Sequence, residues 1–255
     1  MGKRQVYKIS ENHEALVSYK KYFDIEVFEG MISKHQYPWH FHNCYTIILV
    51  EMGSVIYEIQ DQKVEVGKNE VLILEPFFIH RNIIAQLTSY KAIFIPNEYL
   101  DLGEQNKILT QIVHHPTIVG SIVDLLNKIK LTENKNEINA SFSELRELIN
   151  QLQIKQRVVS HFKSNIMPKI DYDLTINELS EKAHLSKFHY QRKFKKYNGL
   201  TIGQLKQQEK TVKAKALLEN GKFSTDVAYE LGFFDQSHFI KYFKKMWATT
   251  QKNFK

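Results

Sequence analysis

Cysteine is nearly absent from this sequence, and so are long apolar runs. Of the 255 residues only Cys44 is a cysteine, so no disulfide can form within the chain. Apolar stretches such as YTIILV and FFI are far shorter than the roughly 20 residues that a membrane-spanning helix requires. The first residues, MGKRQVYKIS, lack the apolar core of a signal peptide. We therefore expect a cytoplasmic protein with no membrane partner.

Glycine and proline are also scarce, at 10 and 5 residues, and no low-complexity segment is present. With 43% hydrophobic and 25% charged residues, the composition is that of an ordinary globular chain. The length predicts one large domain or two smaller ones.

Acidic residues become scarce toward the C-terminus, so the positive net charge of +7 is concentrated in the C-terminal part of the chain. Residues 157 to 255 hold 19 Lys and Arg against 9 Asp and Glu, a balance of +10, whereas the remainder carries −3. Such an asymmetry indicates a nucleic-acid-binding half joined to something else. A merely lysine-rich surface would give the same totals, so charge alone leaves both interpretations open.

Residues 22 to 96 consist of short runs rich in Ile, Val, Tyr and Phe, separated by turn residues. These runs are FDIEVFEG, CYTIILVE, VIYEIQ, KVEV, EVLILEP, RNIIAQ and YKAIFIP. Seven or more closely spaced strands predict a sandwich or a barrel.

Residues 97 to 170 change to a helical pattern. TIVGSIVDLLNKIK has apolar residues at helical spacing, and FSELRELINQLQIKQRVVSHFKSNI continues the pattern after a polar loop. The second stretch carries an apolar stripe, which consists of Leu145, Leu148, Ile149, Leu152 and Val159. We expect this stripe to form a dimer interface, although it could instead pack on the barrel of its own chain.

From about Asp171 onward the sequence predicts six or seven helices with recognisable ends. Thr175 and Glu178 form a capping box, Ser186 caps the next helix, and Gly199 ends it. A long helix of roughly 28 Å then follows to Asn220. The same pattern recurs with Ser224 or Thr225 as a cap, a short helix, the turn FFD and the cap Asp235. Each half therefore matches a helix-turn-helix unit.

The helix after each turn is predicted to have a core face and a DNA-reading face. We expect Tyr190, Phe194 and Tyr197, and later Phe239, Phe243 and Met246, to face the core. The opposite faces offer amide, guanidinium, amine and aromatic groups, which can contact base edges and phosphates. The predicted DNA-contacting residues are Ser186, Lys187, Phe188, His189, Gln191, Arg192 and Lys195 in the first unit, and Gln236, Ser237, His238, Ile240, Lys241, Lys244 and Lys245 in the second.

Residues 171 to 254 resemble the paired helix-turn-helix domain of AraC-type transcription regulators. ELSEKAHLSKFHYQRKFKKYNGLT is similar to the first motif of that family, and VAYELGFFDQSHFIKYFKK is similar to the second. The chain has His184 and Ala248 where glycine is common, and Ile202 and Gln251 where proline is usual. These departures affect helix ends rather than reading faces. The resemblance implies that both motifs contact one side of the duplex, about 34 Å apart.

The segment from PWHFHNCYTIILV to FFIHRN resembles the cupin-like effector domain of many AraC-type regulators. His40 and His42 alternate on an expected strand, and His80 follows at cupin spacing, so we expect all three to converge on one pocket. We expect Thr46 and Tyr57 to supply further walls, with Tyr45 and Ile47 on the opposite face. The histidines could hold an organic ligand, serve structure, or bind a metal with or without the Cys44 thiolate. Because Thr46 stands where metal cupins have Glu, we favour an organic ligand and predict no metal or other cofactor.

These observations predict an α+β protein with three regions. Residues 1–100 would form a cupin-like antiparallel β-barrel that binds an effector, residues 101–156 a helical dimerisation linker, and residues 157–255 an all-α DNA-binding domain. We expect a sequence-specific transcription regulator and not an enzyme. Its expected partners are promoter DNA, a small-molecule effector, a second copy of the chain and, for an activator, RNA polymerase. The alternatives are a constitutive regulator whose barrel only dimerises, and a metal-dependent cupin enzyme.

Overall fold

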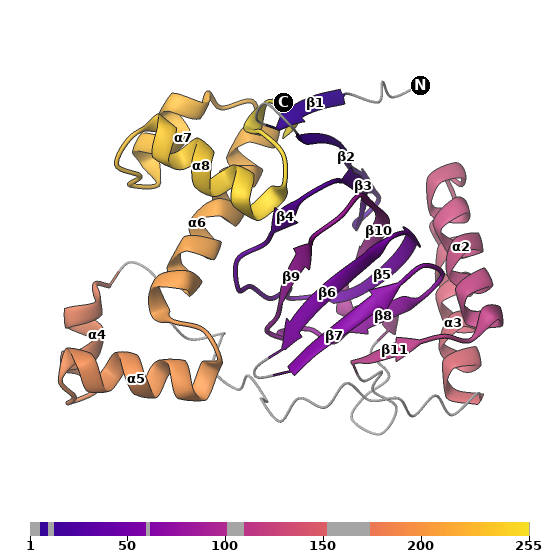
Figure 1. Cartoon of the computed structure of the whole chain (residues 1–255), viewed down its shortest axis with the longest axis horizontal. Coiled ribbons are helices and arrows are strands. Elements are labelled where there is room, and N and C mark those ends of the chain that lie inside the picture. Colours follow the sequence, from indigo (N-terminus) through magenta and orange to yellow (C-terminus); the bar gives the residue numbers. More distant parts are fainter. Residues whose placement is uncertain (1–5, 10–12, 60–61, 101–109, 152–173, 255) are drawn as a thin grey trace.

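The computed structural model describes residues 6–9, 13–59, 62–100, 110–151 and 174–254. Figure 1 shows a β-rich half at the centre, two long helices against it on one side, and a helical half on the other. This arrangement confirms the α+β class and the β-to-α order that the sequence predicts. Among the described residues, no helix is long and apolar enough to cross a membrane.

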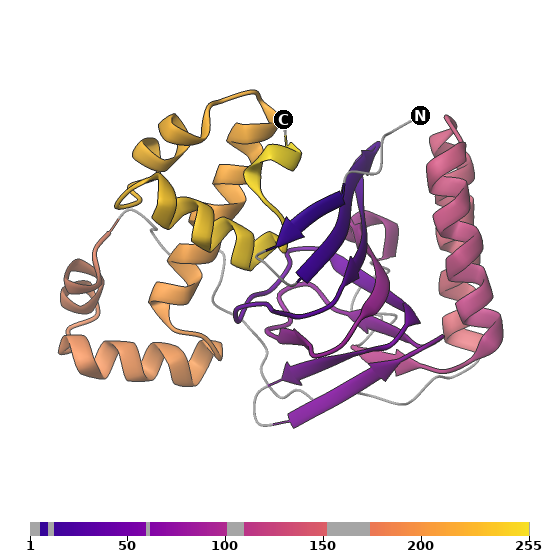
Figure 2. The ribbon, with the colours of Figure 1, turned by 45° about the horizontal axis from the view of Figure 1, so that its top comes forward.

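The β-rich half consists of two antiparallel sheets (Figure 2). The seven-stranded sheet has the order β1 (Val6–Ile9), β2 (His13–Tyr22), β3 (Ile25–Ile32), β10 (Thr88–Ile95), β5 (Tyr45–Met52), β8 (Val71–Leu74) and β11 (Gln111–Val113). The four-stranded sheet has the order β4 (His35–Gln36), β9 (Arg81–Ile84), β6 (Ser54–Ile59) and β7 (Gln62–Gly67). Each of the seven predicted runs overlaps one of these strands, whereas β1, β2, β4 and β11 were not foreseen.

Strand β5 explains the continuous apolar run of the sequence. It lies between β10 and β8, and both of its faces are covered. Tyr45, Ile47 and Leu49 face one core, while Ile48 and Val50 face another, inside the barrel. A strand buried on both faces requires apolar residues at successive positions rather than at alternate ones.

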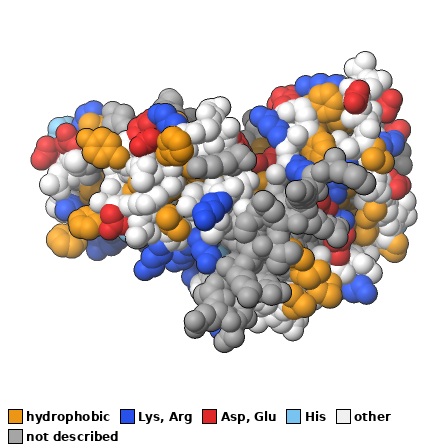
Figure 3. All heavy atoms as spheres, turned by 90° about the horizontal axis from the view of Figure 1, so that it is seen from above, with side chains coloured by type: hydrophobic (Ala, Val, Ile, Leu, Met, Phe, Trp, Pro, Cys, Tyr) orange, Lys and Arg blue, Asp and Glu red, His pale blue; other side chains and the backbone are white. Residues whose placement is uncertain are grey.

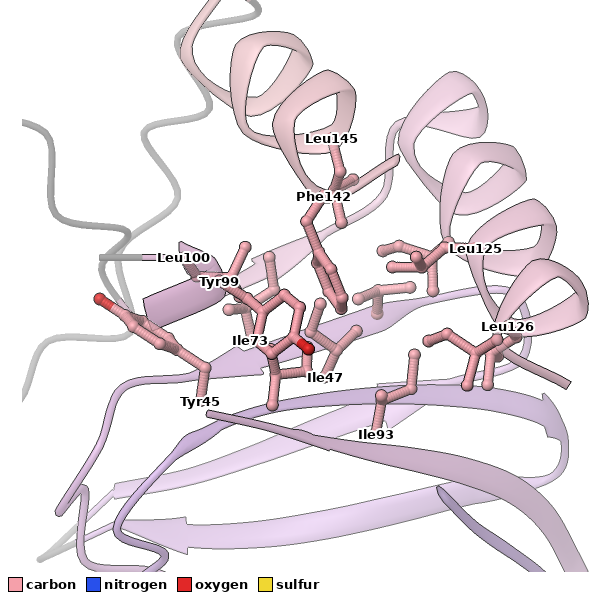
Figure 4. Packing of buried hydrophobic residues seen from close by; sticks show 14 of the residues in the cluster. Tyr45, Ile47, Ile73, Ile93, Tyr99, Leu100, Leu125, Leu126, Phe142 and Leu145 are labelled. Atoms are coloured by element: carbon pink, nitrogen blue, oxygen red, sulfur yellow. The ribbon is translucent and has the colours of Figure 1, made fainter. Parts of the chain in front are cut away.

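Two helices close the outer core of the seven-stranded sheet. They are α2 (Pro116–Leu131) and α3 (Lys135–Gln151), and a short helix α1 (Asn97–Leu100) lies beside them. Figure 4 shows Phe142 and Leu145 of α3 pointing toward Ile47 and Ile73 of the sheet.

This packing decides between the two roles that the sequence left open for the stripe on α3. Leu145 and Ile149 are buried against the barrel of their own chain, and Leu148 is packed there too. They are therefore unavailable for the dimer contact that we expected, because burying them here already satisfies their apolar surface. Leu152 and Val159 lie outside the described residues. Since β11 joins the sheet, the helical region continues the barrel domain beyond residue 100 instead of standing apart.

The helical half begins, in the described residues, with the capped helix α4 (Ile176–Lys182). It continues with α5 (Lys187–Asn198), α6 (Ile202–Glu219), α7 (Ser224–Glu230), α8 (Gln236–Trp247) and the 3-10 helix η3 (Gln251–Phe254). The predicted caps at Thr175, Ser186 and Asp235 are confirmed by their side-chain hydrogen bonds to backbone N–H groups. The predicted cap of α7 is wrong, because the helix begins at Ser224 and Phe223 occupies the cap position.

Candidate DNA interface and effector cavity

Helices α4 and α5 form the first helix-turn-helix unit, and the face of α5 that was expected to read DNA is open. Phe188 is 84% exposed, and Ser186, Lys187, His189, Arg192 and Lys195 are exposed as well, whereas Gln191 is half-buried. The tight turn is made by His184, whose φ of 52° is left-handed and is unusual for a residue other than glycine.

The core face of α5 differs from the expected stripe at its last position. Phe194 is buried and Tyr190 is partly buried against the same cluster, but Tyr197 is 55% exposed. Asn198 takes the inward place, because it lies four residues after Phe194 on the same face. Its side-chain amide donates to the Phe194 carbonyl at 2.8 Å.

Helices α7 and α8 form the second unit, around Phe239 and Phe243, which are fully buried. Gln236 and Ser237 are exposed at the start of α8, as a reading face requires. His238 and Ile240 are half-buried, His238 against Tyr242 and Ile240 against the aromatic core. Ile240 therefore does not lie freely on the reading face, because its apolar side chain packs inward.

The basic end of α8 lies close to the barrel. Lys241, Lys244 and Lys245 line a hollow together with His35 and neighbouring residues of β4 and β9. The His35 imidazole lies 3.0 Å from the Lys245 carbonyl and donates to it through Nε2. Figure 3, which views the molecule from above, shows Lys and Arg side chains gathered on the helical half toward the centre of the picture. In this arrangement Lys241 and Lys245 stay exposed and Lys244 is half-buried, so the barrel lies beside the second basic surface.

Helix α6 joins the two units and also docks on the barrel, a contact that the sequence did not predict. The Gln208 side chain donates to the Phe41 carbonyl at 2.7 Å and accepts from the Phe41 N–H at 3.3 Å. One amide thus pairs with both backbone groups of a single barrel residue, as a neighbouring strand would.

Lys215 on α6 makes the second docking contact. Its ammonium group pairs with Glu26 of β3 and lies over the rings of Tyr19, Trp247 and Phe254, at 5.2, 4.7 and 5.5 Å from their centroids. The Tyr19 hydroxyl also donates to the Trp247 carbonyl at 3.1 Å. A buried cation paired with a carboxylate and surrounded by aromatic faces is strongly held.

The interior of the barrel contains a cavity of about 90 Å³. All five residues that were expected to bind the effector line it: His40, His42, Thr46, Tyr57 and His80. The opposite wall comes from the helical half, through Gln208 and Val212 of α6 and Met246 and Trp247 of α8. The two halves of the molecule therefore enclose one cavity between them.

The three histidines meet at the centre of this cavity. Their ring centroids lie 4.3 Å apart for His40 and His80, 5.0 Å for His40 and His42, and 5.4 Å for His42 and His80. His40 and His80 are held by an isolated β-bridge, in which each backbone N–H donates to the other residue's carbonyl. The expected strand through His40 and His42 is wrong, because β5 begins only at Tyr45.

Burial keeps these imidazoles neutral. It lowers the pKa of His40 to about 4, and it lowers the pKa values of His42 and His80 well below the usual range, with smaller contributions from neighbouring positive charge. Burial also raises the pKa of the Cys44 thiol to about 11. Cys44 is therefore protonated near neutral pH and offers no thiolate to this cluster.

A second polar pair lies in the same cavity. The Tyr37 and Tyr90 hydroxyls are 2.7 Å apart and both side chains are buried. Burial raises the pKa values of both phenols, so both stay neutral. The cavity therefore presents neutral groups that donate and accept hydrogen bonds, and none of its lining residues is a carboxylate.

Comparisons with known proteins agree with this two-part structure. Residues 22–160 match the model of the AraC-like ligand binding domain, and residues 179–255 match a helix-turn-helix domain. The chain is 27% identical over 236 residues to the uncharacterised HTH-type transcriptional regulator YbfI of Bacillus subtilis, covering 83% of each protein. It is 21% identical over 249 residues to the transcriptional activator RhaS of Escherichia coli, covering 85% of this chain and 87% of RhaS.

The fold is also that of a solved regulator. The crystal structure of ToxT from Vibrio cholerae superposes with a TM-score of 0.55 at 14% identity, over 92% of this chain and 98% of ToxT. The ligand-binding match covers more than half of the chain and stands beside a helix-turn-helix match. The chain belongs to the AraC-type transcriptional regulators and combines an AraC-like ligand-binding domain with a helix-turn-helix DNA-binding domain.

Proposed function

We propose that this regulator is an activator whose DNA affinity is set by how tightly its helical half docks on the barrel. The observation that carries the proposal is the shared cavity, because residues of α6 and α8 close the space that the barrel histidines line. Anything that enters the cavity must contact both halves. An effector can shift an equilibrium between two arrangements only if it binds them differently, and a shared wall supplies that difference.

The docked arrangement is proposed to be the weaker DNA binder. In it, the lysines at the end of α8 face the barrel hollow, while the reading face of α5 is exposed. Separation of the halves would remove the barrel from beside the second basic surface and let a duplex approach it, and each phosphate contact releases counterions and adds affinity. An effector that binds the separated arrangement more tightly than the docked one would favour separation and thereby activate.

The cavity also constrains the effector. One ToxT structure is described as bound to an unsaturated fatty acid. Sites for drug-sized molecules usually have volumes of roughly 300 to 1,000 Å³, whereas this cavity has about 90 Å³ and several polar walls. We propose a small polar effector for this chain. We also propose that the chain is not an enzyme, because the same cavity is closed by the DNA-binding domain.

Further partners follow from the proposed role. We propose a cytoplasmic homodimer that contacts RNA polymerase when bound to a promoter. A dimer would double the number of phosphate contacts and hence steepen the salt dependence of binding. Its interface would not use Leu145 or Ile149, which are buried within the chain. Sedimentation of the free protein and of the DNA complex measures the subunit number.

A two-stage experiment tests the proposal. Selection from a random DNA library with the full-length protein gives the preferred sequence. Affinity for that sequence is then measured at several salt concentrations, with and without small polar metabolites that raise the unfolding temperature. We expect at least one stabilising metabolite to tighten DNA binding. If the selection enriches no sequence, the proposal of sequence-specific DNA recognition is wrong. A metabolite that stabilises the protein but weakens its DNA binding would contradict the activator role.

A further inference from the structure

The three cavity histidines form a set of nitrogen ligands with the geometry of a metal site. One ligand atom from each of His40, His42 and His80 lies within 4.8 Å of the others. Zinc bonds histidine nitrogen at about 2.0–2.1 Å, so ligands around one ion stand roughly 3.3 Å apart. To reach this spacing from the present one, the side chains would have to rotate about their χ angles, while the β-bridge holds the backbones of His40 and His80 side by side.

Hydrogen bonds orient two of these rings. The Nδ1 atom of His40 lies 2.8 Å from the Pro38 carbonyl, and the Nδ1 atom of His80 lies 2.9 Å from the Phe78 carbonyl. A carbonyl oxygen only accepts, so each Nδ1 carries the hydrogen and leaves the Nε2 lone pair free. Donation from the distal nitrogen to a backbone carbonyl is the usual outer support of a metal-bound histidine.

The chemistry of the lining selects among metals. Three imidazole nitrogens from His40, His42 and His80 are the ligand atoms that the cavity offers together. Among the described residues that line the cavity there is no carboxylate, and this disfavours Mg²⁺ and Ca²⁺, which require oxygen ligands. Imidazole ligands suit Zn²⁺, Ni²⁺ and Cu²⁺. The nearby positive charge of Lys215 is offset by its ion pair with Glu26.

We propose that His40, His42 and His80 bind one divalent transition-metal ion, with Zn²⁺ as the best match. This departs from the metal-free pocket expected from the sequence. The absence of Glu at position 46 was the ground for that expectation, but three histidines alone are a sufficient protein ligand set for zinc. The inference concerns this ligand set and holds whether or not the proposed activator mechanism is correct.

Metal binding can be measured on the full-length protein without any DNA assay. The protein is stripped with a chelator, dialysed against equimolar Zn²⁺ and analysed for bound metal. Co²⁺ then replaces Zn²⁺, and its visible absorption reports nitrogen coordination. We expect about one metal per chain. His42→Ala, at the least buried of the three positions, should weaken metal binding at least about 100-fold. Loss of a residue that only hydrogen-bonds to a ligand already costs about 10- to 100-fold in metal affinity, and loss of the ligand itself should cost more.

Matched variants separate the site from adventitious binding. His115→Ala removes an exposed histidine at the start of α2 and should bind as wild type does. Cys44→Ser should also retain the metal, because the protonated thiol is not a ligand. Thermal unfolding in chelator confirms that each variant is folded. Metal below a tenth of an equivalent in wild type, or equal binding by His42→Ala, would overturn the proposal. Specific DNA binding by the stripped protein would leave the regulator assignment standing in either case.

Discussion

At the scale of single residues, Arg192 carries the most direct test of DNA reading. It lies on the exposed face of α5, and a guanidinium can bond guanine bidentately. We expect Arg192→Ala to cost about 1–3 kcal/mol on the selected sequence and much less on random DNA. Lys193→Ala is the matched control, since it removes one exposed charge from a neighbouring face. Equal losses on both DNAs would show that Arg192 contacts only phosphate.

His184 offers a prediction about stability. Its φ of 52° places the backbone in the left-handed region, which glycine adopts without strain and which costs other residues roughly 1–2 kcal/mol of conformational free energy. We expect His184→Gly to raise the free energy of unfolding of the DNA-binding half by about 0.5–1 kcal/mol, after the entropy that glycine adds to the unfolded chain. Chemical denaturation measures the change. His184→Ala should give no gain, and a gain of equal size would assign the effect to the lost imidazole.

At the scale of elements, α3 is expected to act as part of the barrel core. Leu145 is buried against the sheet (Figure 4), so Leu145→Ala should lower the free energy of unfolding by about 2–5 kcal/mol. Glu147→Ala, two residues away and exposed, should change it by less than about 0.5 kcal/mol. If Leu145→Ala instead yields a monomer of unchanged stability, the stripe serves dimerisation after all.

The elements also show what sequence could and could not provide. Strand β3, the strands from β5 to β10 and the caps at Thr175 and Ser186 were predictable, because their signals are local: alternating or continuous apolar residues, and a hydroxyl before a helix. Strand β11 was missed because three residues carry too little pattern. Tyr197 was misplaced because periodicity gives a face but does not show which neighbours cover it.

The same distinction holds for the candidate site. Five of the barrel residues that line the cavity were predicted, while others such as Tyr37 were missed. Gln208 and Trp247 were not predicted either. Both belong to the helical half, and they reach the cavity only because the two halves dock. The two contacts of this kind described above join residues 167 and 228 positions apart, and no local spacing records them.

At the scale of the whole molecule, Lys215 tests the coupling between the halves. Lys215→Ala removes the ion pair with Glu26 and three ring contacts, as well as a pair with Glu219 within α6, and should weaken docking by about 2 kcal/mol. If docking restrains the second unit, DNA affinity without effector should rise by up to about 30-fold. Lys213→Ala is the control, because Lys213 is exposed on the same helix and its ion pair, with Glu209, lies within that helix. Equal DNA affinities for the two variants would contradict the coupling.

The positions of the tryptophans allow their fluorescence to report on separation of the two halves. The sequence contains 2 tryptophans, and both stand at the junction of the halves. Trp39 packs with the core of the first unit, and Trp247 packs with that of the second. Separation of the halves would bring both indoles into water and shift their fluorescence to the red. Replacing one indole at a time would show whether the first or the second unit leaves the barrel first, without any attached label.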